Sequence, residues 1–187
     1  MHTLIQQRKG ILINEGEYLN GKRKGKGKEY NRKGKLILEG EYVNGKRNGK
    51  GKEYHDNGEL IFEGEYLNGE RWNGKGKEYN DKGKLIFEGE YLNGERNGKI
   101  YGDKGQLLFE GEYVNGNAKG KEYNDNGELI FEGEYSNGER WNGKGKEYQD
   151  NGELLFEGEY VNGKRNGKEY HDDDDNNEDR KRKIFNL

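Results

Sequence analysis

The side chains that could do chemistry are few, and they do not form a catalytic set. The histidines are His2, His55 and His171, and the chain has no cysteine. His55 and His171 occupy one place of a repeated pattern where asparagine or glutamine stands in other copies, so we interpret them as turn residues. The serine and threonine hydroxyls, Ser136 and Thr3, are isolated. Because no nucleophile is matched with a base, we predict that the protein is not an enzyme.

Other patterns that resemble sites are better interpreted as structural. Glu63 and Glu65 would share one face of a strand, like the carboxylates of a glycoside hydrolase, but the same pair recurs along the chain. Runs of Lys-Gly-Lys-Gly lack the strand-to-helix setting of a phosphate-binding loop. The acidic run 172–179 does not have the spacing of an EF-hand loop. We therefore expect no metal site and no cofactor.

The composition excludes most folds that hold an active site. Of the 187 residues only 27% are hydrophobic, 33 are glycine and none is proline. Leucine, isoleucine, valine and phenylalanine together make up only 18% of the residues, so this chain cannot fill the core of a TIM barrel, a doubly wound sheet or a helix bundle. No run approaches the ~18 apolar residues of a membrane span. A collagen helix is excluded because proline and a three-residue glycine period are missing.

An internal repeat takes the place of a deep core. The string Glu-Gly-Glu-Tyr occurs seven times, at intervals of 22 to 25 residues. All 14 tyrosines fall in two columns of this repeat, and five of the six phenylalanines fall in a third. The repeats differ in length at one place, between the glycine that follows this string and the next tyrosine. We interpret the variable piece as a loop or hairpin end.

Each repeat predicts two short antiparallel strands. Within residues 60–66, Phe62, Gly64 and Tyr66 share one face by simple alternation, and Asn-Gly pairs on both sides predict chain reversals. Gly64, between two rings, leaves room for a ring to lie over the backbone. The predicted fold is all-β: an elongated single-layer antiparallel β-hairpin repeat, a solenoid-like meander of seven repeats. Each repeat would contact only its neighbours.

The residues that carry this pattern resemble a known family. Phe62–Gly69, followed by Gly74–Gly76, is similar to the MORN repeat (membrane occupation and recognition nexus), and the resemblance covers about residues 10–170. Tyrosine replaces the tryptophan that is common at the second aromatic position. Repeats four, five and seven lack the Gly-x-Gly pair and resemble MORN-variant repeats of bacterial proteins, some of them antitoxins. The resemblance implies a scaffold or linker and, for some members, binding to acidic phospholipid.

The repeats define the expected domain limits. We predict one domain over residues 10–170, an N-terminal cap over 1–9 and a charged, disordered tail over 171–187. For the tail, the alternatives are loose binding of divalent ions, a nuclear-import patch and docking of Ile184 and Phe185. Residues 1–9 lack the apolar core of a signal peptide. We expect a cytoplasmic protein, associated with a membrane if it binds lipid.

Charge and aromatic residues supply the candidate binding sites. The formal net charge is −3, and lysine and glutamate alternate within every repeat, which favours a solvated face and disfavours nucleic acid. Trp72 and Trp141 are insertions in long loops, either folded over their own hairpins or exposed as partner anchors. The first tyrosine column is either structural filling or a partly open groove. The candidate partner-binding residues are Trp72, Trp141, Tyr18, Tyr42, Tyr66, Tyr91, Tyr113, Tyr135 and Tyr160.

The resulting hypothesis is a non-enzymatic repeat scaffold. It would mediate protein–protein interaction through the aromatic stripe and loop residues. The alternatives are a peripheral membrane module that binds anionic phospholipid weakly, and an antitoxin-like inhibitor. A glycan-binding repeat protein is disfavoured because the chain has only two tryptophans. Open terminal strands, or aromatic stripes meeting face to face, would also allow a homo-oligomer.

Overall fold

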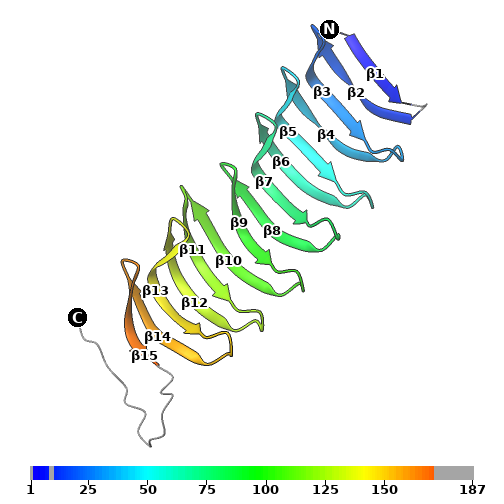
Figure 1. Ribbon diagram of the computed structural model, residues 1–187. Helices are drawn as coiled ribbons and strands as arrows, with labels where there is room; N and C mark the ends of the chain where they lie inside the picture. Colours follow the sequence, from blue (N-terminus) through cyan, green and yellow to red (C-terminus); the bar gives the residue numbers. More distant parts are fainter. Residues whose placement is uncertain (1, 9–10, 171–187) are drawn as a thin grey trace, which may run out of the picture. The chain divides into compact units, whose positions relative to one another are not determined.

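The computed structural model of the chain describes residues 2–8 and 11–170, and this part is all β. Neighbouring strands are antiparallel, and their order in the sheet is their order in the chain (Figure 1). These residues contain no helix that could span a membrane. The strands are β1 (His2–Arg8), β2 (Ile11–Leu19), β3 (Lys22–Tyr30), β4 (Leu36–Val43), β5 (Lys46–Tyr54), β6 (Leu60–Leu67), β7 (Glu70–Tyr79), β8 (Leu85–Leu92), β9 (Glu95–Tyr101), β10 (Leu107–Val114), β11 (Asn117–Tyr123), β12 (Leu129–Ser136), β13 (Glu139–Tyr148), β14 (Leu154–Val161) and β15 (Lys164–Glu169).

The described residues divide into two compact units, one up to residue 97 and one from residue 98 onward, and the boundary lies inside β9. In the first unit β1 to β8 pair in sequence, and in the second β10 to β15 do the same. These pairings confirm the predicted all-β hairpin repeat. The segment predicted as an N-terminal cap contains β1, which pairs with β2 from His2 opposite Tyr18 to Arg8 opposite Ile11.

The hairpins turn differently at their two ends. At one end every repeat has an Asn-Gly pair with positive φ at both residues, such as 55° at Asn68 and 102° at Gly69. This is the two-residue type I′ geometry that fits the twist of the strands. At the other end a four-residue turn has positive φ only at its last residue, as where the Gly58 N–H donates to the His55 carbonyl at 2.8 Å. In residues 57–69 the same Asn-Gly dipeptide therefore closes a longer turn at Gly58 and forms a tight turn at Gly69.

The length variation lies inside strands, which corrects the expected loop or hairpin end. The partners of Glu65 and Tyr66 in β7 are two residues apart, so Trp72 is the extra residue of a β-bulge. Trp141 has the same place in β13. The short hairpin of β14 and β15 pairs without a shift. A bulge absorbs an added residue and leaves the two-residue turn intact, whereas a longer turn would lose its fit to the strand twist.

A ladder of glycines crosses the strands of each unit. In the first unit Gly51 lies opposite Gly64, which in turn lies opposite Gly74. In the second unit the corresponding glycine of β11, Gly120, lies between its counterparts in β10 and β12. The facing glycines carry no side chain on the side of the sheet where the phenylalanine and tyrosine rings lie. The backbone there forms a bare strip, and the rings pack on it.

The phenylalanine and tyrosine rings cover the glycine ladder and form the core. A Cβ added to Gly76 would lie 2.9 Å from the Tyr91 ring and 3.0 Å from the Phe62 ring. The Phe62 centroid lies 5.1 Å from that of Tyr66 and 5.5 Å from that of Tyr91, both edge-to-face. Each such contact contributes about 1 kcal/mol beyond the area it buries. The four phenylalanines that are at most 1% exposed are Phe62, Phe87, Phe131 and Phe156.

A side chain added at one glycine of the ladder should push the facing strands apart and destabilise the sheet. A Cβ on Gly64 would overlap the Asn73 carbonyl oxygen and lie 2.7 Å from the Gly74 Cα, whereas on Gly40 the nearest atoms would be 3.1 Å away. We expect Gly64→Ala to lower the free energy of unfolding by about 2 kcal/mol or more, and Gly40→Ala to lower it by clearly less. Denaturant unfolding measures both, and equal losses would contradict the steric argument.

Candidate functional site

Strand alternation gives each hairpin two unlike surfaces. In β6, Phe62, Gly64 and Tyr66 point to one side, and Glu63 and Glu65 point to the other. We call the side with the phenylalanine and first tyrosine columns the aromatic face. The opposite side, with the glutamates of Glu-Gly-Glu, is the charged face. The two faces offer different chemistry to a partner.

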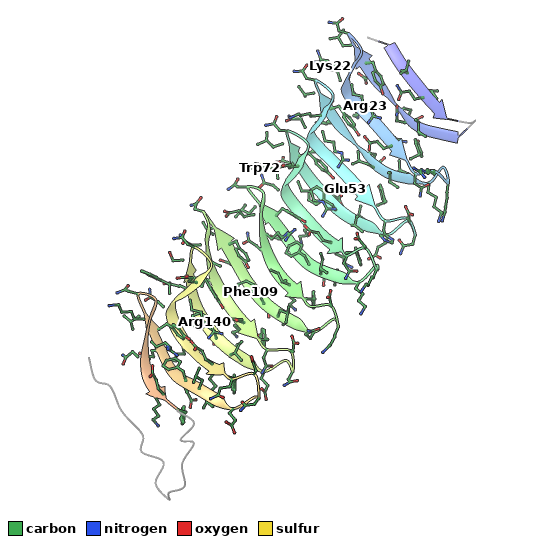
Figure 2. All side chains as sticks on the ribbon, in the orientation of Figure 1. Lys22, Arg23, Glu53, Trp72, Phe109 and Arg140 are labelled. Carbon is green, nitrogen blue, oxygen red and sulfur yellow. The ribbon has the colours of Figure 1, made fainter. Side chains whose placement is uncertain are left out.

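On the aromatic face, arginine and glutamate side chains hold the rings in place. In the second unit the Tyr135 hydroxyl donates to Glu122 Oε2 at 2.9 Å, and Arg140 Nε donates to the same oxygen at 2.9 Å. The Arg140 guanidinium lies 5.0 Å from the Phe131 centroid and donates to the Tyr160 hydroxyl at 3.3 Å (Figure 2). Arg140 therefore joins the rings of two successive hairpins.

The first unit repeats this arrangement. Arg71 pairs with Glu53, donates to the Tyr91 hydroxyl at 3.1 Å and lies 4.8 Å from the Phe62 centroid (Figure 2). Sequence reasoning missed this role for the arginines and glutamates. The available signal was spacing, because an arginine stands five residues after the first-column tyrosine in six of the seven repeats.

The structure places the first tyrosine column inside this network. Five of its seven members are only 3 to 7% exposed, and the other two are half-buried. The buried rings contact the chain's own glycines and arginines, which supports structural filling over an open groove. A part in partner binding stays a prediction for this column. The five buried members are Tyr18, Tyr42, Tyr66, Tyr91 and Tyr160, and the half-buried ones are Tyr113 and Tyr135.

Burial and neighbouring glutamates raise the pKa of tyrosine hydroxyls in both tyrosine columns. Burial raises the pKa of Tyr42, and the nearby Glu29 carboxylate raises it further. In the second tyrosine column, burial and a 2.8 Å hydrogen bond to Glu15 raise the pKa of Tyr30 to about 12. Burial and a bond to Glu39 likewise raise the pKa of Tyr54 to about 12. Burial also raises the pKa of Tyr66, Tyr79, Tyr91, Tyr135 and Tyr160.

The charged face of the first unit contains a groove of about 810 Å³. Its floor is the backbone of the glycine ladder from Gly16 to Gly64, and Thr3 and Ile5 lie at one end. Six glutamates and four lysines line it, in rows that alternate in sign from strand to strand. The lining ion pairs are exposed and add little stability, as in the 3.0 Å pair of Lys52 and Glu63. Their charges are thus accessible to a partner.

Exposed apolar side chains precede the type I′ turns. Each follows a first-column tyrosine, so alternation places it on the charged face. Their exposed fractions lie between 40 and 52%. Regularly spaced apolar groups beside a charged groove give a partner both kinds of contact. The row comprises Leu19, Val43, Leu67 and Leu92 in the first unit and Val114 and Val161 in the second.

The tryptophans lie at bulges within β7 and β13, not in long loops, which corrects that expectation. A Cβ on Gly94 would lie 3.4 Å from the Trp72 ring, and one on Gly163 would lie 3.3 Å from the Trp141 ring. Each ring thus packs on the turn of the following hairpin rather than over its own. Trp72 is half-buried, and Trp141 is 39% exposed.

The remaining candidates do not form a catalytic or metal site in the described residues. His55 belongs to a four-residue turn, and its ring centroid lies 5.4 Å from that of Tyr79. No group of three histidine, aspartate or glutamate side chains in residues 2–8 and 11–170 could hold a metal ion. His171 and the predictions for the charged tail lie outside the described residues.

Comparison with known families agrees with the repeat geometry. The family model described as MORN repeat matches residues 15–35 and 39–59. The model described as MORN repeat variant matches residues 72–93, 117–137 and 141–162. A search of curated proteins finds no match. The resemblance inferred from the sequence is confirmed.

The raised tyrosine pKa values predict a loss of stability at alkaline pH. The folded protein keeps its phenol protons to higher pH than the unfolded chain, whose tyrosines ionise near pH 10. The stabilisation is therefore complete below about pH 10 and is lost as the pH rises through about 12. Tyrosinate absorbance should rise in more than one step in the native protein and in one step in denaturant. A single native step near pH 10 would contradict this expectation.

Proposed function

We propose, because the chain belongs to the MORN-repeat family, that it is a non-enzymatic scaffold that binds a protein partner. MORN repeats are generally modules for interaction with proteins or membranes. The observation that carries the proposal is the groove on the charged face of the first unit, with its glycine floor and walls of both signs.

The groove has the chemistry of a protein-binding surface. The floor is bare backbone between the rows of charged side chains, so a partner segment can approach it closely. The alternating walls match a segment that also carries charges of both signs, and such complementarity gives specificity. Leu19, Val43 and Leu67 add apolar contacts on the same face. These features support a protein partner with a mixed-charge, partly apolar segment.

The same groove does not favour an anionic membrane. Six glutamates against four lysines give its lining a net negative charge. Binding to acidic headgroups requires an excess of basic side chains near the surface. We therefore favour the protein-binding scaffold over the peripheral membrane module as the proposed function. An antitoxin-like inhibitor is itself a protein-binding module, so the identity of the partner decides that alternative.

Exchanging one ion pair tests the groove. In Lys52→Glu with Glu63→Lys, the 3.0 Å pair keeps its attraction but the charge pattern of the lining is inverted. Like charges would then face each other across the interface, so we expect capture of the partner from an extract of the source cell to fall at least about tenfold. Affinity capture with quantitative mass spectrometry measures the change.

A matched exchange and a membrane assay complete this test. Lys146→Glu with Glu157→Lys exchanges a 3.1 Å pair in the second unit, whose residues do not line the groove, and should leave capture unchanged. Equal effects of the two exchanges would refute the groove. Sedimentation with anionic vesicles at low salt should show no binding. Salt-sensitive vesicle binding would support the membrane module instead.

The tryptophans are proposed as additional anchors. Trp141 leaves 39% of its surface exposed, and large aromatic rings dominate many interfaces. We expect Trp72→Ala combined with Trp141→Ala to weaken partner capture by about tenfold, with the β-sheet spectrum unchanged. Tyr148→Ala is a suitable control, because Tyr148 is 38% exposed on the same strand as Trp141. An equal loss in the control would argue against specific anchors.

A further inference from the structure

One position on the aromatic face departs from the repeat. An arginine follows the first-column tyrosine by five residues in six repeats, but after Tyr113 this place holds Ala118. Each of the six arginines lies over at least one phenylalanine or tyrosine ring, at 4.8 to 5.8 Å from the centroid. They are Arg23, Arg47, Arg71, Arg96, Arg140 and Arg165.

The rings that such an arginine would cover are present at Ala118. Arg140 covers the rings of Phe131 and Tyr160, whose centroids are 5.4 Å apart. The equivalent rings at Ala118 are those of Phe109 and Tyr135, at 5.8 Å and also edge-to-face. Phe109 is 9% exposed, more than the phenylalanines of the four other repeats that carry one. The greater exposure of Phe109 agrees with the absence of a guanidinium over its ring.

The glutamate that would pair with an arginine of its own hairpin is also present. In the first unit Glu53 accepts from Arg47 of its own hairpin at Oε1, 3.0 Å away, and from Arg71 of the next hairpin at Oε2. Glu122 accepts from Arg140 of the next hairpin at Oε2. Its own hairpin carries Ala118 instead of arginine, so within the described residues Glu122 Oε1 has no arginine partner.

The glutamate that would pair with an arginine at this position from the preceding hairpin is also absent. Eighteen residues before Arg71 and before Arg96 stands the glutamate that each pairs with. Eighteen residues before Ala118 stands Ile100, which lies opposite Phe109 in β9. Ile100 and Ala118 are both half-buried. An apolar wall of this kind suits the methylene stem of an arginine.

We propose that these residues form a binding site for an arginine side chain of the protein partner. Its guanidinium stacks on the Phe109 and Tyr135 rings and donates to Glu122 Oε1, while its stem lies against Ile100 and Ala118. Arginine fits better than lysine because its planar group stacks on rings and hydrogen-bonds a carboxylate at the same time. The site deepens the proposed function and rests on it for the source of the arginine.

A small probe tests the site on the full chain. Acetyl-arginine amide is titrated into the protein, and the ring protons of Phe109 and Tyr135 are followed by NMR. We expect saturable shifts, with acetyl-citrulline amide and acetyl-lysine amide each binding about three- to tenfold more weakly. Citrulline has nearly the same shape without the charge, and lysine has the charge without the plane. Equal binding of arginine and citrulline, or of arginine and lysine, would overturn the proposal.

Variants distinguish binding at this site from binding elsewhere on the protein. In Ala118→Arg the chain's own arginine should occupy the site. This variant should therefore have a higher melting temperature and should not bind the probe. Asn117→Arg adds the same charge at an exposed position of the same hairpin and should leave binding unchanged. Glu122→Gln keeps the shape of the side chain and should weaken binding, which serves if Ala118→Arg fails to fold. Undiminished binding in Ala118→Arg or Glu122→Gln would refute the site.

The two proposals fail in different ways. The probe needs no partner, so absent arginine binding overturns this site and leaves the groove exchange as it stands. A groove exchange without effect, combined with normal probe binding, overturns the groove alone. If both hold, Ala118→Arg should also reduce partner capture, because it occupies the place of the partner's arginine.

Discussion

The contact between aromatic rings and bare glycine backbone is the interaction on which this structure depends. A single layer of strands has no second layer to cover it, so its apolar side chains must find their contacts within the sheet. Gly64 and Gly76 allow this, because the rings of Phe62 and Tyr91 lie over the backbone where a Cβ would otherwise stand. The result is buried phenylalanines in a chain that is only 27% hydrophobic. Each hairpin needs only its neighbours to complete this packing.

This packing assigns different roles to the two faces. On the aromatic face the polar atoms are used internally, since Arg140 and Glu122 bind each other and the tyrosine hydroxyls beside them. On the charged face the glutamates and lysines form weak, exposed ion pairs, and Glu15 and Glu39 also accept hydrogen bonds from tyrosine hydroxyls. A partner can therefore engage most of these charges at little cost to the fold. The aromatic face maintains the sheet everywhere except at the proposed arginine site, and the charged face is available for binding.

Much of the fold could be predicted from the sequence, because columns of identical residues show which positions share an environment. The tyrosine and phenylalanine columns indicate the core, and the Asn-Gly pair at Asn68 indicates a tight turn. The bulge at Trp72 could not be predicted, since spacing shows that a residue is added but not whether a turn or a strand absorbs it. The arginine network was also missed, because charged side chains look alike in sequence whether they are solvated or folded over rings.

The departure at Ile100 and Ala118 shows how one repeat can differ from the others in its surface chemistry and still keep the same fold. Removing one member of a partly buried ion pair leaves a charge without compensation, which is strongly destabilising. Replacing both members by apolar residues avoids that penalty and is often neutral. Here the glutamate and the arginine that pair in other repeats are absent together, while Phe109, Tyr135 and Glu122 keep their places. In a chain that otherwise repeats one pattern, specific recognition depends on exceptions of this kind, because at these positions the surface differs from one hairpin to the next.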